Sequence, residues 1–168
     1  MSPARWFGRV RRVASQFEQV GDVWLALRVL AWACVLPALK HMVPVRSLAR
    51  LMHAPAGVLP RDAAREARIV MFTRWAARVP RWKSGGNCLE RGLIAYRYLG
   101  VAGASPTLVV GMGHNDGDVI GHAWVLVDGR PAGETETSLA AYTPVFAFAP
   151  DGSLVAGPRR AASRQERS

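Results

Sequence analysis

The residues best suited to chemistry begin with a cysteine. Cys88 follows the run Ser-Gly-Gly-Asn, in which Ser84 or Asn87 could cap a helix that starts there. The free N–H groups and the positive dipole end at a helix start favour an anion, so a thiol at this place is positioned to ionise. The same N–H groups could stabilise an oxyanion. Cys88 is therefore a candidate nucleophile, and the alternative is a cysteine that only packs in the interior.

A nucleophile of this kind needs a base, and the chain has four histidines. His41 and His53 lie near prolines in the helical half, where we expect surface or loop positions. His114 belongs to a polar loop. His122 lies in the apolar strand pattern GHAWVLV, with Trp124 two residues on and on the same face. His122 is the candidate base, and the alternative is a half-buried strand histidine without a catalytic role.

A carboxylate should orient the imidazole, and the first three that follow His122 in the sequence are Asp128, Glu134 and Glu136. Asp128 precedes a glycine at a hairpin tip, six residues from His122 and so ~20 Å away along a strand, which is too far. The returning strand brings Glu134 and Glu136 back. With a two-residue turn, Thr135 of the returning strand would lie opposite His122. With one extra residue in a bulged turn, Glu136 would lie opposite His122 and Glu134 diagonal to it on the same face. Both glutamates stay candidates, and the alternative for both is a solvated edge strand.

The second cysteine, Cys34, lies in an apolar run, and we expect it in the core. Two cysteines without a C-x-x-C pair make neither a disulfide framework nor a paired zinc motif, which is typical of a cytoplasmic protein. A zinc site built from Cys88, His114 and His122 would lack an obvious fourth ligand. We expect neither a metal nor a cofactor.

The elements that must position these residues fall into two halves. Helical periodicity predicts helices over 17–36, 45–52 and 61–79, with Pro37 ending the first. A further helix begins at Cys88, and strands follow at 106–112, 119–127 and 142–149. Asp128-Gly129 is a hairpin turn whose partner strand is RPAGETET. The fold class is α+β.

We expect three regions along the chain. Residues 1–80 form a helical N-terminal region, residues 81–157 a core of one helix and an antiparallel sheet, and residues 158–168 a disordered basic tail. The net charge of +10 is uneven, because residues 1–80 carry 13 Lys and Arg against 4 Asp and Glu. A basic face suits an acidic partner or a membrane surface. No nucleic-acid-binding motif is present, so we expect no nucleic-acid partner.

The longest apolar stretch covers 23–39, interrupted by Arg28 and Pro37. A membrane span needs about 20 nearly uncharged residues. We therefore expect a helix that is buried or faces a partner, with contact to a membrane surface as the alternative. The basic N-terminus lacks the features of a secretory signal.

Four blocks of the sequence, taken together, suggest a family: NCLERGLIAYRYL, TLVVGM, GHAWVLVDGRPAGE and YTPVFAF. They cover about 84–149 and closely resemble the protease component of lasso-peptide biosynthesis, a transglutaminase-like (papain-like) cysteine protease that removes the leader from a ribosomally made precursor. The resemblance implies that residues 81–157 are the protease core. It assigns Cys88 as nucleophile and His122 as base. The family's acidic residue lies twelve positions beyond the histidine, which favours Glu134, although aspartate is common there.

The resemblance also implies partners. Single-chain members carry a leader-recognition domain before the protease, and nothing in residues 1–80 looks like one. We therefore expect a cytoplasmic protease half of a split system, with association to a membrane as the alternative. Its partners would be the precursor peptide, a stand-alone recognition protein and a lasso cyclase resembling asparagine synthetase, with the apolar stripe at 20–39 as a docking surface. The alternatives are an acyltransferase of the transglutaminase or arylamine N-acetyltransferase kind, and a non-catalytic scaffold.

Overall fold

The protein combines a group of helices with one antiparallel sheet. A computed structural model describes residues 20–54, 60–76, 87–115 and 118–156. The helices in these ranges are α2 (Val20–Met42), α3 (Val45–Met52), α4 (Ala63–Ala76), α5 (Cys88–Val101) and the short α6 (Glu136–Leu139). The strands are β1 (Pro106–Asn115), β2 (Asp118–Val127), β3 (Arg130–Pro131), β4 (Tyr142–Phe148) and β5 (Leu154–Ala156). The predicted α+β class is confirmed.

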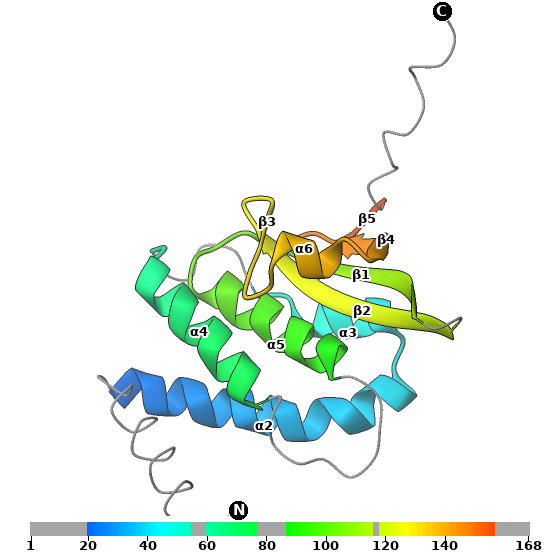
Figure 1. Ribbon diagram of the computed structural model, residues 1–168. Coiled ribbons are helices and arrows are strands. Elements are labelled where there is room, and N and C mark those ends of the chain that lie inside the picture. Colours follow the sequence, from blue (N-terminus) through cyan, green and yellow to red (C-terminus); the bar gives the residue numbers. More distant parts are fainter. Residues whose placement is uncertain (1–19, 55–59, 77–86, 116–117, 157–168) are drawn as a thin grey trace, which may run out of the picture.

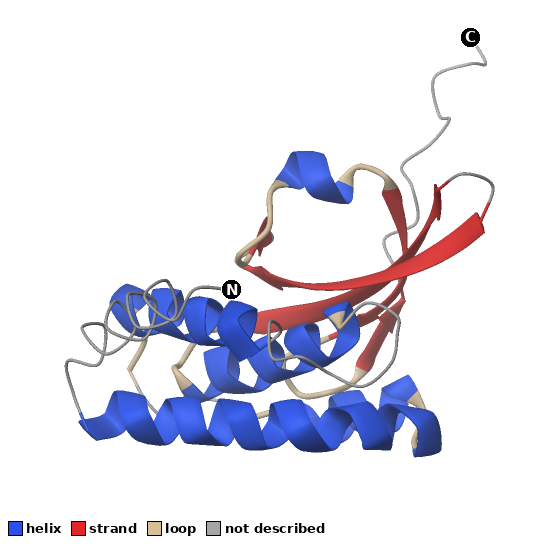
Figure 2. Cartoon of the chain, turned by 60° about the horizontal axis from the view of Figure 1, so that its bottom comes forward, coloured by secondary structure: helices blue, strands red, loops and turns tan. Residues whose placement is uncertain are grey.

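The sheet lies on one side of the molecule and the longer helices on the other (Figures 1 and 2). Its strand order is β3-β2-β1-β4-β5, with every neighbouring pair antiparallel. Helix α5 packs on β1 and β2, and it also contacts α2, α3 and α4. The main core therefore forms around α5, from side chains such as Leu36, Leu48, Ile69, Leu93 and Phe148.

Helix α5 comes close to the sheet because of a glycine. A Cβ atom added at Gly92 would lie 3.1 Å from a methyl carbon of Leu108 and 3.6 Å from the carbonyl oxygen of Ala123. A larger side chain would thus push the helix away from β1 and β2. Since Ala123 follows His122 in β2, this contact brings the start of α5 close to the candidate base.

The hairpin turn at Asp128-Gly129 is confirmed. Both residues have positive φ, 52° and 76°, as a two-residue turn of type I′ requires, and Val127 pairs with Arg130. The partner strand is much shorter than predicted, however. Only Arg130 and Pro131 pair with β2, and the next hydrogen bond, from the Ala132 N–H to the carbonyl of Val125 at 2.8 Å, is the last.

The chain leaves the sheet at Gly133, where φ is 82°. Thr135 then caps α6, because its side-chain oxygen accepts a hydrogen bond from the Ser138 N–H. A continuous strand through Glu134 and Glu136 was therefore a wrong prediction. The positive φ and the helix cap turn the backbone away from β2 before it reaches His122.

Helix α2 differs from its prediction in two ways. It continues through Pro37 to Met42, whereas we expected an end at Pro37. Leu36 is buried just before the proline and Lys40 pairs with Glu90 of α5 just after it, so tertiary contacts hold the helix on both sides of Pro37. Cys34, expected in the core, is exposed. Its neighbour Ala33 lies on the buried stripe, so the next residue points outward.

The predicted bounds of the other two N-terminal helices are close to those in the structure. The helix at 45–52 is α3, and the helix predicted over 61–79 is α4 as far as Ala76, beyond which the chain is not described until Asn87. The 158–168 tail likewise lies outside the described residues. The division into an N-terminal region and a protease core stays a prediction. The main core takes side chains from α2, α3 and α4 as well as from α5 and the sheet.

Candidate active site

Cys88 is the first residue of α5, as predicted. Asn87 occupies the cap position, with φ −89° and ψ 22°, but its side chain makes no capping hydrogen bond. Its carbonyl oxygen accepts from the Arg91 N–H at 3.0 Å, which closes the first turn. Ser84, the other predicted cap, lies outside the described residues. The helix start is thus built by backbone hydrogen bonds.

The Cys88 thiol lies against the strand that carries His122. Its Sγ atom is 3.8 Å from the carbonyl oxygen of Gly121, the residue immediately before His122. The cysteine is half-buried, so solvent and a substrate can reach it. The sulfur is therefore not sealed in aliphatic packing, and it lies beside the backbone of the strand that carries the candidate base.

The imidazole of His122 is held between aromatic rings and a carboxylate. Its ring stacks on Tyr142 with centroids 4.7 Å apart, and its centroid is 6.0 Å from that of Trp124. Its Nε2 atom lies 2.8 Å from Oε2 of Glu134. Only 17% of the His122 side chain is exposed. These contacts limit both the rotation of the ring and its access to water.

Glycines in β1 make room for this stack. Gly111 pairs with His122, and a Cβ atom there would lie 2.9 Å from the Trp124 ring and 2.8 Å from the carbonyl oxygen of Thr143. A Cβ atom at Gly113 would lie 3.0 Å from the Tyr142 ring. Side chains at these positions would collide with the rings that contact His122.

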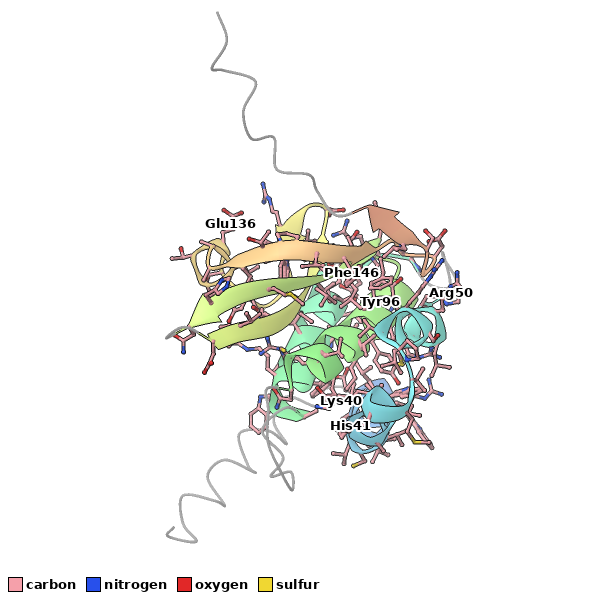
Figure 3. The ribbon with its side chains drawn as sticks, turned by 90° about the vertical axis from the view of Figure 1, so that its right-hand side faces the viewer. Lys40, His41, Arg50, Tyr96, Glu136 and Phe146 are labelled. Carbon is pink, nitrogen blue, oxygen red and sulfur yellow. The ribbon has the colours of Figure 1, made fainter. Side chains whose placement is uncertain are left out.

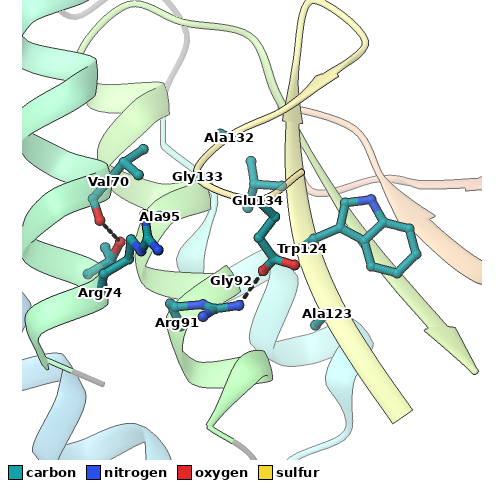
Figure 4. A pocket seen from close by; sticks show the side chains of 12 residues that line it. Val70, Arg74, Arg91, Gly92, Ala95, Ala123, Trp124, Ala132, Gly133 and Glu134 are labelled. Atoms are coloured by element: carbon teal, nitrogen blue, oxygen red, sulfur yellow. Dashed lines mark hydrogen bonds and ion pairs between the residues drawn. The ribbon is translucent and has the colours of Figure 1, made fainter. Parts of the chain in front are cut away.

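Glu134 reaches His122 from the loop after β3. The backbone turns at Gly133, and the carboxylate comes to rest beside the part of β2 that β3 leaves uncovered. One oxygen faces His122, and the other contacts the guanidinium of Arg91 (Figure 4). Because Arg91 is one helical turn beyond Cys88, α5 supplies both the thiol and the cation that contacts this carboxylate.

The other carboxylates lie elsewhere. Glu136 starts α6 and is exposed, and Figure 3 shows it at the outer side of that helix. Asp128 lies at the hairpin tip, as predicted, and pairs with Arg61 at 2.7 Å. Of the two glutamates left open by register, the structure brings Glu134 to His122. It arrives by a loop, however, and not by the cross-strand pairing that we predicted.

The remaining histidines do not join the site. His41 and His114 are exposed, and His53 is half-buried with its Nδ1 atom against the carbonyl oxygen of Arg50. Within the described ranges, no three His, Cys, Asp or Glu side chains gather as metal ligands would.

Sequence reasoning assigned no role to Arg91 and Tyr142. Arg91 had a detectable signal, since it is three residues after Cys88 and i, i+3 positions share a helix face. Tyr142 had none, because its contact with His122 depends on the order of the strands. A small hollow of about 20 Å³ extends from Glu134 and Arg91 toward α4, where Val70 and Arg74 line it (Figure 4).

This arrangement has the chemical components of covalent acyl chemistry. A half-buried thiol lies at a helix start, an imidazole is on the adjoining strand, and a carboxylate orients the imidazole. In cysteine enzymes, groups of these kinds carry out attack on a carbonyl carbon and proton transfer to a leaving group.

Comparison with known proteins assigns a family. No curated protein and no solved structure matches the chain. The model of the transglutaminase-like superfamily, however, matches residues 26–147, which is more than half of the sequence and includes the start of α5, the strand of His122 and the Glu134 loop. The chain belongs to the transglutaminase-like superfamily.

Proposed function

We propose that the protein is a cysteine peptidase that removes the leader from a lasso-peptide precursor. Transglutaminase-like proteins are usually cysteine peptidases or transferases, so the general chemistry follows from the family. The observation that carries the proposal is the contact of Glu134 with His122, next to the strand backbone that the Cys88 thiol contacts. The choice of a lasso precursor rests on the resemblance of the sequence blocks.

The first half of the reaction forms an acyl-enzyme. With Nε2 of His122 donating to Glu134, Nδ1 is the ring nitrogen left to take the thiol proton. The Cys88 sulfur attacks the carbonyl carbon at the leader–core junction, and the N–H groups at the start of α5 stabilise the oxyanion. When the C–N bond breaks, His122 protonates the departing core amine and the leader remains as a thioester on Cys88.

The second half releases the leader. His122 removes a proton from water, the hydroxide attacks the thioester, and the sulfur leaves as a thiolate that regains the proton. Glu134 orients the imidazole in both halves and stabilises its protonated form. Each step needs only the protein, the peptide and water.

The proposal includes partners. A stand-alone recognition protein would present the precursor, and a cyclase resembling asparagine synthetase would receive the freed core peptide. The hollow beside Arg91 and Glu134 is small, which suits recognition of a peptide mainly by a partner and not by a deep pocket of this chain.

The first prediction concerns cleavage of a lasso precursor in the presence of its recognition protein. Cys88→Ala should abolish cleavage, and Glu134→Gln should slow it by about 10²-fold or more, because His122 loses its charged partner. The matched controls are Cys34→Ala and Glu136→Gln, which should cleave like the wild type because both residues are exposed and away from His122. Products are followed by mass spectrometry, and folding by circular dichroism.

Three outcomes would oppose the proposal. Cleavage of the precursor by a folded Cys88→Ala variant would show that Cys88 is not the nucleophile. Leader transferred to an added amine, in preference to water, would make the protein an acyltransferase with the same site. In a Cys34→Ala background, a Cys88 that iodoacetamide modifies no faster than an ordinary thiol, together with no cleavage, would favour a scaffold.

A further inference from the structure

Helix α2 has an apolar face that the described parts of the molecule leave uncovered. Its outward side chains include Trp24, which is 61% exposed, Leu27 at 52% and Leu30 at 43%. The other members of this face are Val23, Ala31, Cys34, Val35, Ala38 and Met42. At 1.5 Å per residue the face runs for ~28 Å, which is nearly the whole helix. We refer to these nine residues as the outer face of α2.

The opposite side of α2 is fixed to the protein at both ends. Asp22 pairs with Arg68 of α4 at 3.2 Å, and Lys40 pairs with Glu90 of α5 at 2.9 Å (Figure 3 labels Lys40). Asp22 and Glu90 are only 6% and 2% exposed. Although Gly21–Met42 is long and apolar enough to cross a membrane, with mean hydropathy 1.7, crossing would break both buried pairs. The helix is therefore held flat against the body.

Within the described residues 20–52, which include α2 and α3, every exposed charge is positive. Asp22 is the one acidic residue of 20–52, and it is buried. Arg28 of α2 and Arg46 and Arg50 of α3 are exposed. In the sequence, residues 1–19 add four arginines and one acidic residue, Glu18. An exposed apolar face near positive charges complements a membrane surface, in which anionic headgroups cover apolar acyl chains.

We propose that α2 rests in the plane of an anionic membrane surface, with its outer face in the boundary between headgroups and acyl chains. A helix with an exposed apolar face gives one attractive contribution, and a nearby basic cluster gives the second that stable peripheral binding needs. Arg28, one turn beyond Trp24 on α2, lies at the edge of the outer face, where anionic headgroups would meet it. This surface is separate from Cys88, His122 and Glu134, so the proposal does not depend on the peptidase function.

The test uses the full chain and vesicles of phosphatidylcholine, alone or mixed with phosphatidylglycerol. We expect the wild type to sediment with the anionic vesicles, more weakly as salt is raised. Leu27→Glu/Leu30→Glu should weaken this binding at least about tenfold, because two exposed apolar side chains that would enter the membrane become charged. Its matched control is Leu154→Glu/Val155→Glu, which should bind like the wild type. These two residues are 43% and 45% exposed, and they belong to β5, on the other side of the molecule from α2 (Figure 1).

Two results would overturn the proposal. One is a wild type that binds neither kind of vesicle. The other is a Leu27→Glu/Leu30→Glu variant that binds anionic vesicles as well as the wild type does. A shift of that variant from dimer to monomer without lipid, with no vesicle binding by the wild type, would assign the outer face to a second copy of the chain. In a Cys34→Ala background without vesicles, the rate at which iodoacetamide modifies Cys88 should be unchanged by Leu27→Glu/Leu30→Glu, which keeps this test separate from that of the peptidase.

Discussion

At the scale of single residues, the acidic member of the site is the informative one. Glu134 is longer than the aspartate common in the resembling family, and both of its oxygens are engaged, one by His122 and one by Arg91. A free glutamate has more rotamers than an aspartate, so an anchor for its second oxygen should matter. We interpret Arg91 as a positioning residue that acts through Glu134.

The second prediction follows from this contact. Arg91→Met should lower kcat for precursor cleavage by up to about 100-fold with little change in KM, because Glu134 can then turn away from His122. Arg91→Lys should restore part of kcat, since a cation returns without the planar fork. A rise in KM at unchanged kcat would instead place Arg91 in peptide binding. Equal loss in both variants, with lower melting temperatures, would mean a purely structural role.

At the scale of elements, the start of α5 is held from two sides. Gly92 lets the helix approach β1 and β2, and the buried Glu90 ties it to Lys40 of α2. The Cys88 thiol therefore stands on a helix whose first turn is joined both to the sheet and to α2. Helix α2 therefore helps to position Cys88 through α5, although none of the contacts given above joins a described residue of α2 to His122.

The third prediction tests this tie by denaturant unfolding. Lys40→Met should lower the free energy of unfolding by about 3–5 kcal/mol, because it leaves the Glu90 carboxylate buried without a cation. The double variant Lys40→Met/Glu90→Gln should recover most of that loss. Arg46→Met, which removes an exposed arginine from α3, is the control and should stay within about 0.5 kcal/mol. Equal losses in single and double variants would show that the two residues are not coupled.

At the scale of the whole molecule, Tyr96 joins the helices to the far end of the sheet. From α5 its hydroxyl donates to the carbonyl oxygen of Ala149 and accepts from the Gly152 N–H at 3.0 Å. Burial raises the pKa of Tyr96 from its ordinary value of 10.0 to about 12, with the Gly152 hydrogen bond opposing the rise. The folded protein therefore holds this proton more tightly than the unfolded chain does.

The fourth prediction is a loss of stability in alkali. The contribution of Tyr96 is complete below pH 10.0, where the hydroxyl is protonated in both states, and it disappears as the pH rises toward about 12. Melting temperatures measured across this range should fall more steeply for the wild type than for Tyr96→Phe. The variant should also be less stable at neutral pH by about 1–3 kcal/mol, because both hydrogen bonds of the buried hydroxyl, to the Ala149 carbonyl oxygen and from the Gly152 N–H, are lost. Parallel pH curves for the two proteins would contradict this assignment.

Local sequence patterns by themselves determined most of the elements. The limits of α3, the start of α5 at Cys88 and the Asp128-Gly129 turn follow from periodicity, glycines and turn chemistry, which act over a few residues. His122 could be chosen as the base because its strand pattern is local as well.

Tertiary structure decided what depends on distant partners. The turn at Gly133 and its packing bring Glu134 to His122, while Glu136 goes to α6, and the sequence could not rank them by register. The exposure of Cys34 was decided in the same way, because a helix that is apolar all round does not reveal which face other elements will cover. Periodicity reports the geometry of one segment, and the choice among its faces belongs to the segments that pack on it.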